Sequence, residues 1–181
     1  ALLENVNSAS LDIRLGEFIL VESNAHSVSH NGYHPKVLSL KQRDQLTTHK
    51  INIKEKGCYV LRPGEFILAQ SIEIFHLPLD ISAEYKLKSS MARVGLEHLN
   101  AGWCDAGWNN SVLTLEFRNL TTFHEIELCY GDKIGQMLFY KHAPVDLDNS
   151  YARKGTYNGD LTVSSAKPEA TPPVRCTNCE E

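Results

Sequence analysis

The sequence predicts an all-β domain, and two observations support that prediction. Short runs rich in Ile, Leu, Val and Phe, partly in alternation with polar residues, recur along the 181 residues, and Gly, Pro, Asn or Asp separates them. Stretches with helical periodicity are scarce. Short strands at this spacing favour a closed or two-layered antiparallel architecture, which is a jelly roll or a barrel.

Five segments carry the strand pattern. In chain order they are "LDIRLGEFILV" (11–21), "GEFILAQSIEIF" (64–75), "SVLTLEFRNL" (111–120), "HEIELCY" (124–130) and "IGQMLFY" (134–140). Turn sequences such as "RPGE", "LPLD", "DAGWNN" and "YGDK" lie between them. The string "GEFIL" occurs at 16–20 and at 64–68, and we interpret it as two similar strand starts rather than a repeat.

Two short helices are predicted, over "KVLSLKQRDQL" (36–46) and "SSMARVGL" (89–96). In the second, Ser89 or Ser90 is the expected N-cap and Gly95 the expected stop. We expect one domain over residues 1–163. The Pro-rich, polar stretch 164–181 is typical of an arm or tail rather than of a core.

Composition narrows the classes of function. The net charge is −4 and no long Lys/Arg run is present, so the charge distribution does not favour binding to a nucleic-acid backbone. No apolar run approaches the roughly 20 residues of a membrane helix, and the first ten residues do not read as a signal peptide. Five cysteines are an odd number in a chain long enough to fold without disulfides. We therefore predict a reduced, cytoplasmic protein.

Metal-binding patterns are weak. One CxxC lies at 176–179 without a second pair at zinc-ribbon spacing, and "HSVSHNGYH" (26–34) spaces three histidines in a loop-like stretch. Zinc-dependent nucleotide deaminases need H-x-E and a later P-C-x-x-C, and neither occurs. We expect no zinc site, and we interpret Cys104 as a small buried side chain.

The segment "KSSMARVG" (88–95) admits two interpretations. Backbone amides at a helix start, the hydroxyls of Ser89 and Ser90, and the cations Lys88 and Arg93 could form a cradle for phosphate. The same residues are equally typical of a helix N-terminus that binds no ligand and carries two surface charges. The pattern alone does not separate the two.

A carboxylate interrupts an apolar strand at Glu116, between Leu115 and Phe117. Base rates favour an outward-pointing side chain on an alternating strand. An inward carboxyl would be costly unless it moved protons. Nearby, "AGWCDAGW" (101–108) is typical of a turn in which two glycines let the backbone approach a ligand closely.

The motifs S-S-x-x-R-x-G-L, A-G-W-x-D-x-G-W and L-E-F, with "VNSASLDIRLG" (6–16) before them and "IGQMLF" (134–139) after them, resemble the dCTP deaminases of the dUTPase-related superfamily. The resemblance covers well over half of the chain. It implies a distorted, dUTPase-like jelly roll and a homotrimer with active sites between subunits. It also implies zinc-independent hydrolysis of dCTP to dUTP and ammonia, with Mg²⁺ accompanying the triphosphate. Some members continue to dUMP and pyrophosphate.

The resemblance assigns the catalytic roles. Glu116 matches the carboxyl that relays protons between water, N3 and the leaving amine. Ser89 and Arg93 match residues that hold the water and orient that carboxyl, and backbone near Ala101 would also contact the water.

Substrate-binding roles follow from the same likeness. Lys88 and Ser90 match phosphate-binding positions, although the family commonly has Arg at the first, so the charge is kept and the bidentate fork is lost. Asp105 matches the acceptor of the deoxyribose 3′-hydroxyl. Trp108 matches the aromatic that packs under the sugar and excludes a 2′-hydroxyl.

The C-terminal arm departs from the family's K-Y-x-x-Q pattern. Tyr157 fits, but Thr156 and Asp160 stand at the Lys and Gln positions. An aspartate there would repel a triphosphate unless magnesium intervenes. Arg153 or Lys154 could supply the missing charge. These changes would suit a variant that acts on a 5-substituted dCTP.

Three functions are compatible with the sequence. The first is a deaminase of dCTP or a modified dCTP, with or without hydrolysis of dUTP. The second is a dUTPase alone, which would have no use for a carboxyl such as Glu116 at C4. The third is a non-catalytic trimeric nucleotide-binding module.

Overall fold

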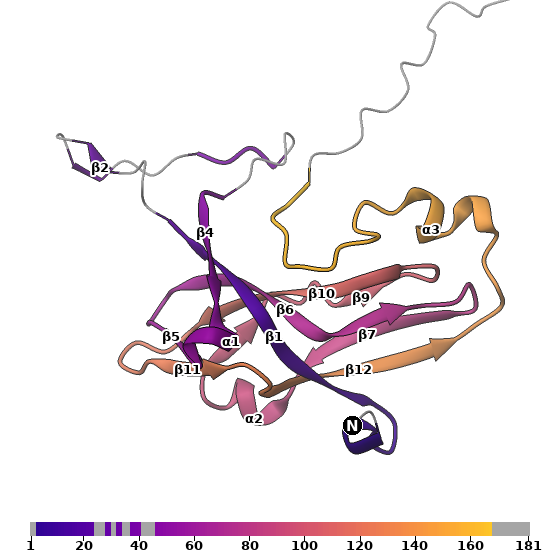
Figure 1. Ribbon diagram of the computed structural model, residues 1–181, viewed down its shortest axis with the longest axis horizontal. Coiled ribbons are helices and arrows are strands. Elements are labelled where there is room, and N and C mark those ends of the chain that lie inside the picture. Colours follow the sequence, from indigo (N-terminus) through magenta and orange to yellow (C-terminus); the bar gives the residue numbers. More distant parts are fainter. Residues whose placement is uncertain (1–2, 24–27, 30–31, 34–36, 41–45, 168–181) are drawn as a thin grey trace, which may run out of the picture.

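The computed structural model describes residues 3–23, 28–29, 32–33, 37–40 and 46–167. Its main feature is a curled, eight-stranded antiparallel sheet of order β8-β10-β6-β1-β12-β7-β9, with β4 also paired to β1 (Figure 1). The strands are β1 (Leu11–Glu22), β4 (Thr48–Asn52), β6 (Phe66–His76), β7 (Ile81–Leu87), β8 (Leu96–His98), β9 (Trp103–Cys104), β10 (Asn109–Asn119) and β12 (Lys133–Lys141). Two small sheets pair β5 (Cys58–Leu61) with β11 (Ile126–Cys129), and β2 (Val28–Ser29) with β3 (Gly32–Tyr33).

Strand β1 joins the two halves of the curl. Residues 11–14 pair with β12, whereas the later part of the strand pairs with β6 and β4. Register shifts lie between Ile13 and Arg14 and between Leu15 and Ile19, where the strand changes partners. The curl encloses one apolar core, because alternate residues of each strand point inward. Among the fully buried side chains are Ile13, Leu15, Ile19, Ile67, Tyr85, Leu115, Phe117 and Met137.

The all-β prediction is confirmed, and each of the five predicted segments overlaps an observed strand. The sequence interpretation missed β7. Its residues Ile81, Ala83, Tyr85 and Leu87 alternate with polar ones and form a full-length strand in the middle of one half. The other strands that were missed have five residues or fewer: β2, β3, β4, β5, β8 and β9.

Helices are few and short: η1 (Leu3–Asn5), α1 (Ile53–Lys56), α2 (Ser89–Ala92), η2 (Leu147–Asn149) and α3 (Tyr151–Lys154). Helix α2 confirms the predicted helix at 89, but its N-cap is Lys88 and no side chain caps it, so the serine cap was wrong. Of the predicted helix 36–46, residues 37–40 are not helical, and 36 and 41–45 lie outside the described residues. In the described part of the chain, no helix is long and apolar enough to cross a membrane.

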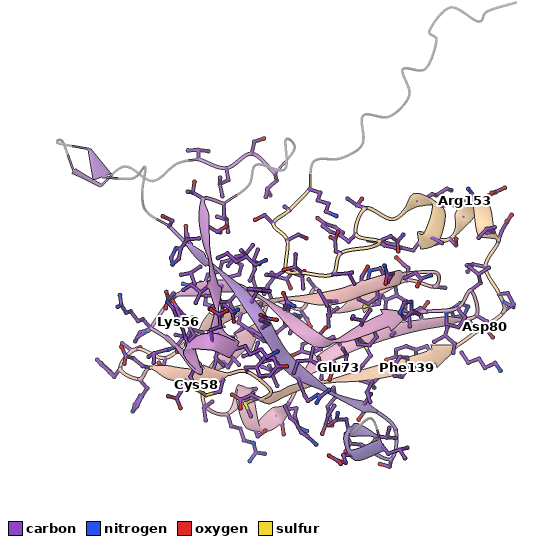
Figure 2. All side chains as sticks on the ribbon, viewed as in Figure 1. Lys56, Cys58, Glu73, Asp80, Phe139 and Arg153 are labelled. Atoms are coloured by element: carbon purple, nitrogen blue, oxygen red, sulfur yellow. A yellow bond between two sulfur atoms is a disulfide. The ribbon has the colours of Figure 1, made fainter. Side chains whose placement is uncertain are left out.

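The cysteines correct a second prediction. Cys58 and Cys129 lie directly opposite each other in the β5–β11 pair and form a disulfide, so the expectation of fully reduced cysteines was wrong for these two. Figure 2 shows Cys58 at the end of the molecule away from Arg153 of α3. Cys104 is buried and unpaired, as predicted, and burial raises the pKa of its thiol to about 12. The CxxC at 176–179 and the histidines of 26–34 lie outside the described residues.

Candidate active site

A cavity of about 530 Å³ lies over one face of the β6–β10 pair. Its floor is formed by alternate residues of the two strands: Phe66 and Leu68 from β6, and Thr114 and Glu116 from β10. Leu68 and Glu116 are direct partners in the antiparallel register. The period of two along each strand is what brings these four side chains to the same face.

The loop 101–108 forms one wall of this cavity, with Ala101, Asp105 and Trp108 among the lining residues. Its glycines allow close packing against the protein's own backbone rather than against a ligand. A Cβ on Gly102 would lie 2.3 Å from the carbonyl oxygen of Tyr85, and one on Gly107, where φ is +87°, would lie 3.1 Å from the backbone nitrogen of Ala152. The predicted close approach is therefore to the chain's own backbone.

Asp105 is exposed on this wall, and its Oδ1 accepts a hydrogen bond of 2.8 Å from the indole Nε1 of Trp103. Trp103 also lines the cavity, although 57% of its surface is exposed. A carboxylate with one donor fixed in place keeps further acceptor capacity for a ligand hydroxyl. The sequence interpretation quoted Trp103 within its motif but gave it no role.

Trp108 is buried and ties the wall to the C-terminal segment. Its ring stacks on Phe75 with centroids 5.5 Å apart, and its Nε1 donates to the carbonyl oxygen of Tyr157 at 3.0 Å. The hydroxyl of Ser111 donates to the same carbonyl at 2.9 Å. Trp108, which the family resemblance places under the sugar, is thus held in a fixed position by these contacts.

Residues 156–167 cross the β6 and β10 strands as a strap (Figure 1). The backbone N–H of Val112 donates to the carbonyl of Asp160, and that of Val163 donates to Oε1 of Gln70. Val163 is buried, and Tyr157, Asp160 and residues 164–166 line the cavity. The first residues of the predicted tail therefore belong to the cavity wall.

Asp160 does not present an unmatched charge. Its carboxylate forms an ion pair of 2.6 Å with Lys167 and accepts a hydrogen bond from Ser164 at 3.1 Å. The expected repulsion of a triphosphate is offset by Lys167, which the sequence interpretation missed. No pattern in the sequence singles out a lysine seven residues further on.

Lys154 faces a different space. It lines a second pocket of about 310 Å³, and its Nζ donates to Oδ1 of Asn149 at 2.6 Å. Asp105 and Tyr151 line both pockets, so the two lie side by side. Arg153 is exposed on α3.

The predicted phosphate cradle is not assembled with this cavity within one chain. Ser89, Ser90 and Arg93 are exposed on α2, and neither they nor Lys88 are among the residues that line the cavity. Figure 1 shows α2 at the edge of the sheet opposite to the strap. The residues predicted to act together thus fall into two groups.

Lys88 has a buried partner. Its Nζ lies 2.7 Å from Oδ1 of Asp12, whose side chain is 5% exposed. Asn7 donates to the same carboxylate at 2.8 Å, and Nζ of Lys133 lies 3.2 Å from Oδ2. The hydrogen bond from Lys88 does most to hold the pKa of Asp12 at about 2, against the opposing effect of burial. We call these four residues the Asp12 cluster.

Glu116 lies partly in the cavity and partly in the protein. Its side chain is 25% exposed, and it lies between the fully buried Leu115 and Phe117. The oxygen Oε2 is inaccessible and lies 3.3 Å from Nε2 of His98. Neither the outward nor the inward prediction describes this placement fully. His98 was missed, because a histidine in "LEHLN" carries no spacing signal.

Within the described residues, one group has metal-ligand spacing, and it joins Glu127 to Cys58 and Cys129. Both sulfurs belong to the disulfide and are not available as thiolate ligands. The carboxylates on the main cavity wall are Asp105, Glu116 and Asp160. Such oxygens suit Mg²⁺ as partial ligands beside phosphate oxygens.

Comparison with known proteins places the fold. The family model for dCTP deaminase-like domains matches residues 1–142. The solved structure of 2′-deoxycytidine 5′-triphosphate deaminase from Agrobacterium tumefaciens superposes with a TM-score of 0.55 at 26% identity, over 76% of this chain and 40% of that chain. The chain belongs to the dCTP deaminase-like family, and the predicted distorted jelly roll is confirmed.

Two curated relatives carry the name "dCTP deaminase, dUMP-forming". The protein from Pseudarthrobacter chlorophenolicus is 34% identical over 137 residues, which are 75% of this chain and 66% of that protein. The protein from Corynebacterium kroppenstedtii is 32% identical over 165 residues, which are 90% of this chain and 83% of that protein. The chain thus spans just under two thirds of the length of the first of these relatives.

Proposed function

We propose that this chain hydrolyses the 4-amino group of dCTP in the cavity around Glu116. The observation that carries the proposal is a carboxyl on the cavity floor that faces Ala101, Asp105 and Trp108 on the wall. The family membership and the names of the two relatives support it. A cavity of this size and mixed polarity is typical of a small-molecule site.

One carboxyl can serve both halves of the reaction. Glu116 takes a proton from water as the water oxygen bonds to C4, and it gives that proton to N3. It then takes the proton of the new C4 hydroxyl and passes it to the amine, and the C4–N4 bond breaks to release ammonia. The ring ends as uracil with its N3–H, so the atoms balance without a metal-bound hydroxide.

The rest of the cavity suits a deoxynucleotide. Asp105 would accept the 3′-hydroxyl, and Trp108 would pack under the sugar. The strap carrying Tyr157 and Asp160 would cover the substrate. Magnesium would enter with the triphosphate and neutralise its charge, and the reaction needs no zinc. Ammonia release should therefore survive a zinc-selective chelator when Mg²⁺ is in excess.

We further propose a homotrimer in which a neighbouring copy supplies Lys88, Ser89, Ser90 and Arg93. The support is the separation of α2 from the cavity of its own chain and the exposure of the two serines and the arginine. Light scattering at micromolar concentration should give three times the chain mass. A monomer that turned over dCTP would contradict the shared site.

The names of the relatives favour dUMP rather than dUTP as the final product, which corresponds to dCTP plus two waters giving dUMP, ammonia and pyrophosphate. Incubation with dCTP and Mg²⁺, followed by separation of nucleotides and an ammonia assay, tests this. Parallel reactions contain dUTP or a 5-substituted dCTP. Hydrolysis of dUTP without ammonia release from any cytosine nucleotide would identify a dUTPase instead. Binding without turnover would identify a nucleotide-binding module.

A further inference from the structure

Three buried polar atoms meet beside the cavity without a hydrogen-bond partner among the described residues. They are the hydroxyl oxygen of Tyr85, Nε2 of His98 and Oε2 of Glu116. Each such atom lowers stability when it is buried and unsatisfied. Native proteins hold few of them, and three at one place are typical of a functional site.

The rings of this group are fixed by packing. His98 ends β8 and is 6% exposed, and its ring meets the edges of Tyr85 at 4.7 Å and Phe117 at 5.8 Å between centroids. Tyr85 packs so closely over Gly135 that a Cβ there would lie 2.0 Å from the Tyr85 ring. Neither ring has room to turn, so the direction in which Nε2 points is set by the core.

Glu116 meets this fixed nitrogen with one oxygen only. Oε2 lies 3.3 Å from Nε2 of His98, and the exposed part of the side chain lies at the cavity. The contact is within ion-pair range but lacks hydrogen-bond alignment. Catalytic hydrogen bonds are often long or poorly aligned without substrate and tighten when it binds.

We infer that His98 is a positioning residue for Glu116: its Nε2–H holds Oε2, so that the other carboxyl oxygen stays aimed at the reacting atoms. This inference rests on the proposed function. An ionised carboxylate can only accept, so the tautomer with hydrogen on Nε2 follows from the pairing. His98 is buried and does not line the cavity, so it acts through Glu116.

The chemistry explains why such a restraint is useful. Glu116 must collect and deliver a proton twice, to N3 and then to the amine. Displacements near 1 Å can cost about 100-fold in rate, so a carboxyl that turns freely would lose much of its effect. Tyr85 packs edge-on against His98, and burial together with the charge of Glu116 raises the pKa of its hydroxyl above the ordinary value, which keeps it neutral.

The test replaces His98 by Phe, which keeps a ring between Tyr85 and Phe117 but removes the N–H. We expect kcat for dCTP deamination to fall by about 10–100-fold and KM to change by less than about threefold, because the sugar and phosphate contacts remain. His98→Gln places an amide donor near the same position and should restore part of the rate. His124→Phe is the matched control at an exposed site and should leave kcat unchanged.

A pH profile separates positioning from packing. An N–H donor favours the ionised carboxylate, so without it the acidic limb of the kcat profile should move to higher pH in His98→Phe. A merely structural residue would lower Tm or the amount of folded protein without moving that limb. An unchanged kcat and profile in folded His98→Phe would overturn the inference.

A spectroscopic measurement covers the case in which both His98 variants fail to fold. Imidazole ¹⁵N shifts of the wild-type chain report which ring nitrogen carries hydrogen for each of the eight histidines. In Glu116→Gln, one buried histidine should change its Nε2 shift, and no such change would overturn the pairing. If the wild-type chain releases no ammonia from dCTP, the proposed function fails, whatever the shifts show.

Discussion

Two carboxylates, the buried Asp12 and the partly buried Glu116, differ in how completely neighbouring donors and cations pair with them. The carboxylate of Asp12 accepts a hydrogen bond from Asn7 and forms ion pairs with Lys88 and Lys133, and its pKa is held at about 2. In Glu116, the inaccessible oxygen Oε2 lies beside His98 and has no hydrogen-bond partner among the described residues. Both interrupt apolar strands of the same sheet.

The difference separates stability from chemistry. A fully matched carboxylate is fixed in its ionised form and contributes to folding, but it cannot exchange protons near neutral pH. An incompletely matched one costs stability and keeps acceptor capacity for other groups. The Asp12 cluster therefore supports the fold and the position of Lys88, whereas Glu116 is the residue to which we assign the proposed reaction.

The largest expected effect is that of Glu116→Gln on turnover. The amide keeps the size but cannot relay protons, so kcat should fall by about 10²–10⁴-fold, with dCTP binding within about tenfold of wild type. The free energy of unfolding should change by less than about 0.5 kcal/mol, because the amide keeps the size of the side chain and one of its oxygens. Single-turnover kinetics and urea unfolding measure the two. A variant that released ammonia at the wild-type rate would end this mechanism.

Asp12→Asn should have the opposite effect to Glu116→Gln, with a large change in stability and a smaller change in turnover. The amide leaves Lys88 and Lys133 facing each other without a counter-charge, and the free energy of unfolding should fall by roughly 1–3 kcal/mol. Urea unfolding at pH 7 measures this. Deamination by the folded fraction should drop less than in Glu116→Gln. A free energy of unfolding within about 0.3 kcal/mol of wild type would show that the Asp12 cluster does not stabilise the fold.

Lowering the pH should show the contribution of the Asp12 cluster to stability without a mutation. The folded pKa of Asp12 lies below its ordinary value of 3.8, so its contribution is present above about pH 4 and is lost as the pH falls toward 2. The loss should be roughly 1–2 kcal/mol, reduced from the full linkage value because Lys133 is half exposed. Urea unfolding at pH 5 and pH 3 measures it. In Asp12→Asn the drop should be smaller, and an equal drop would assign the acid sensitivity to other groups.

The smallest expected effect is at Trp103. Trp103→Phe keeps a ring on the wall and removes the donor to Asp105, so that carboxylate becomes less well oriented toward a 3′-hydroxyl. The ratio of kcat/KM for dCTP to that for 2′,3′-dideoxy-CTP should fall about two- to fivefold, because the contact with the 3′-hydroxyl is weakened rather than removed. An unchanged ratio would mean that Asp105 is oriented by other contacts or does not meet the sugar.

Much of the fold was predictable because strand alternation is a local signal. The five segments with dense branched residues all became strands, and the glycine turns between them were recognisable. Glu116 could be singled out for a similar reason, since a carboxylate within an apolar run is conspicuous. Strand β7 shows the limit: apolar and polar residues alternate along it, but only Ile81 and Leu87 are large aliphatic residues, and the strand was missed.

Long-range partners could not be read from the sequence. The disulfide depends on the register of β5 against β11, and the contact of His98 with Glu116 depends on where β8 ends beside β10. The pairs Asp12 with Lys88 and Asp160 with Lys167 likewise depend on how the chain returns to itself. Local propensity carries no information on such encounters, which are decided by packing.

The disulfide has a consequence for the unfolded chain. Cys58 and Cys129 are 71 residues apart, and the segment between them holds β6 to β10, α2 and both members of the His98–Glu116 pair. A covalent ring of that size restricts the denatured ensemble and, on chain-entropy grounds, stabilises the fold by about 4 kcal/mol. The segment that carries the His98–Glu116 pair is thus a closed loop in every state of the oxidised chain, whereas Asp12, Lys133 and the strap lie on the two free ends of the chain.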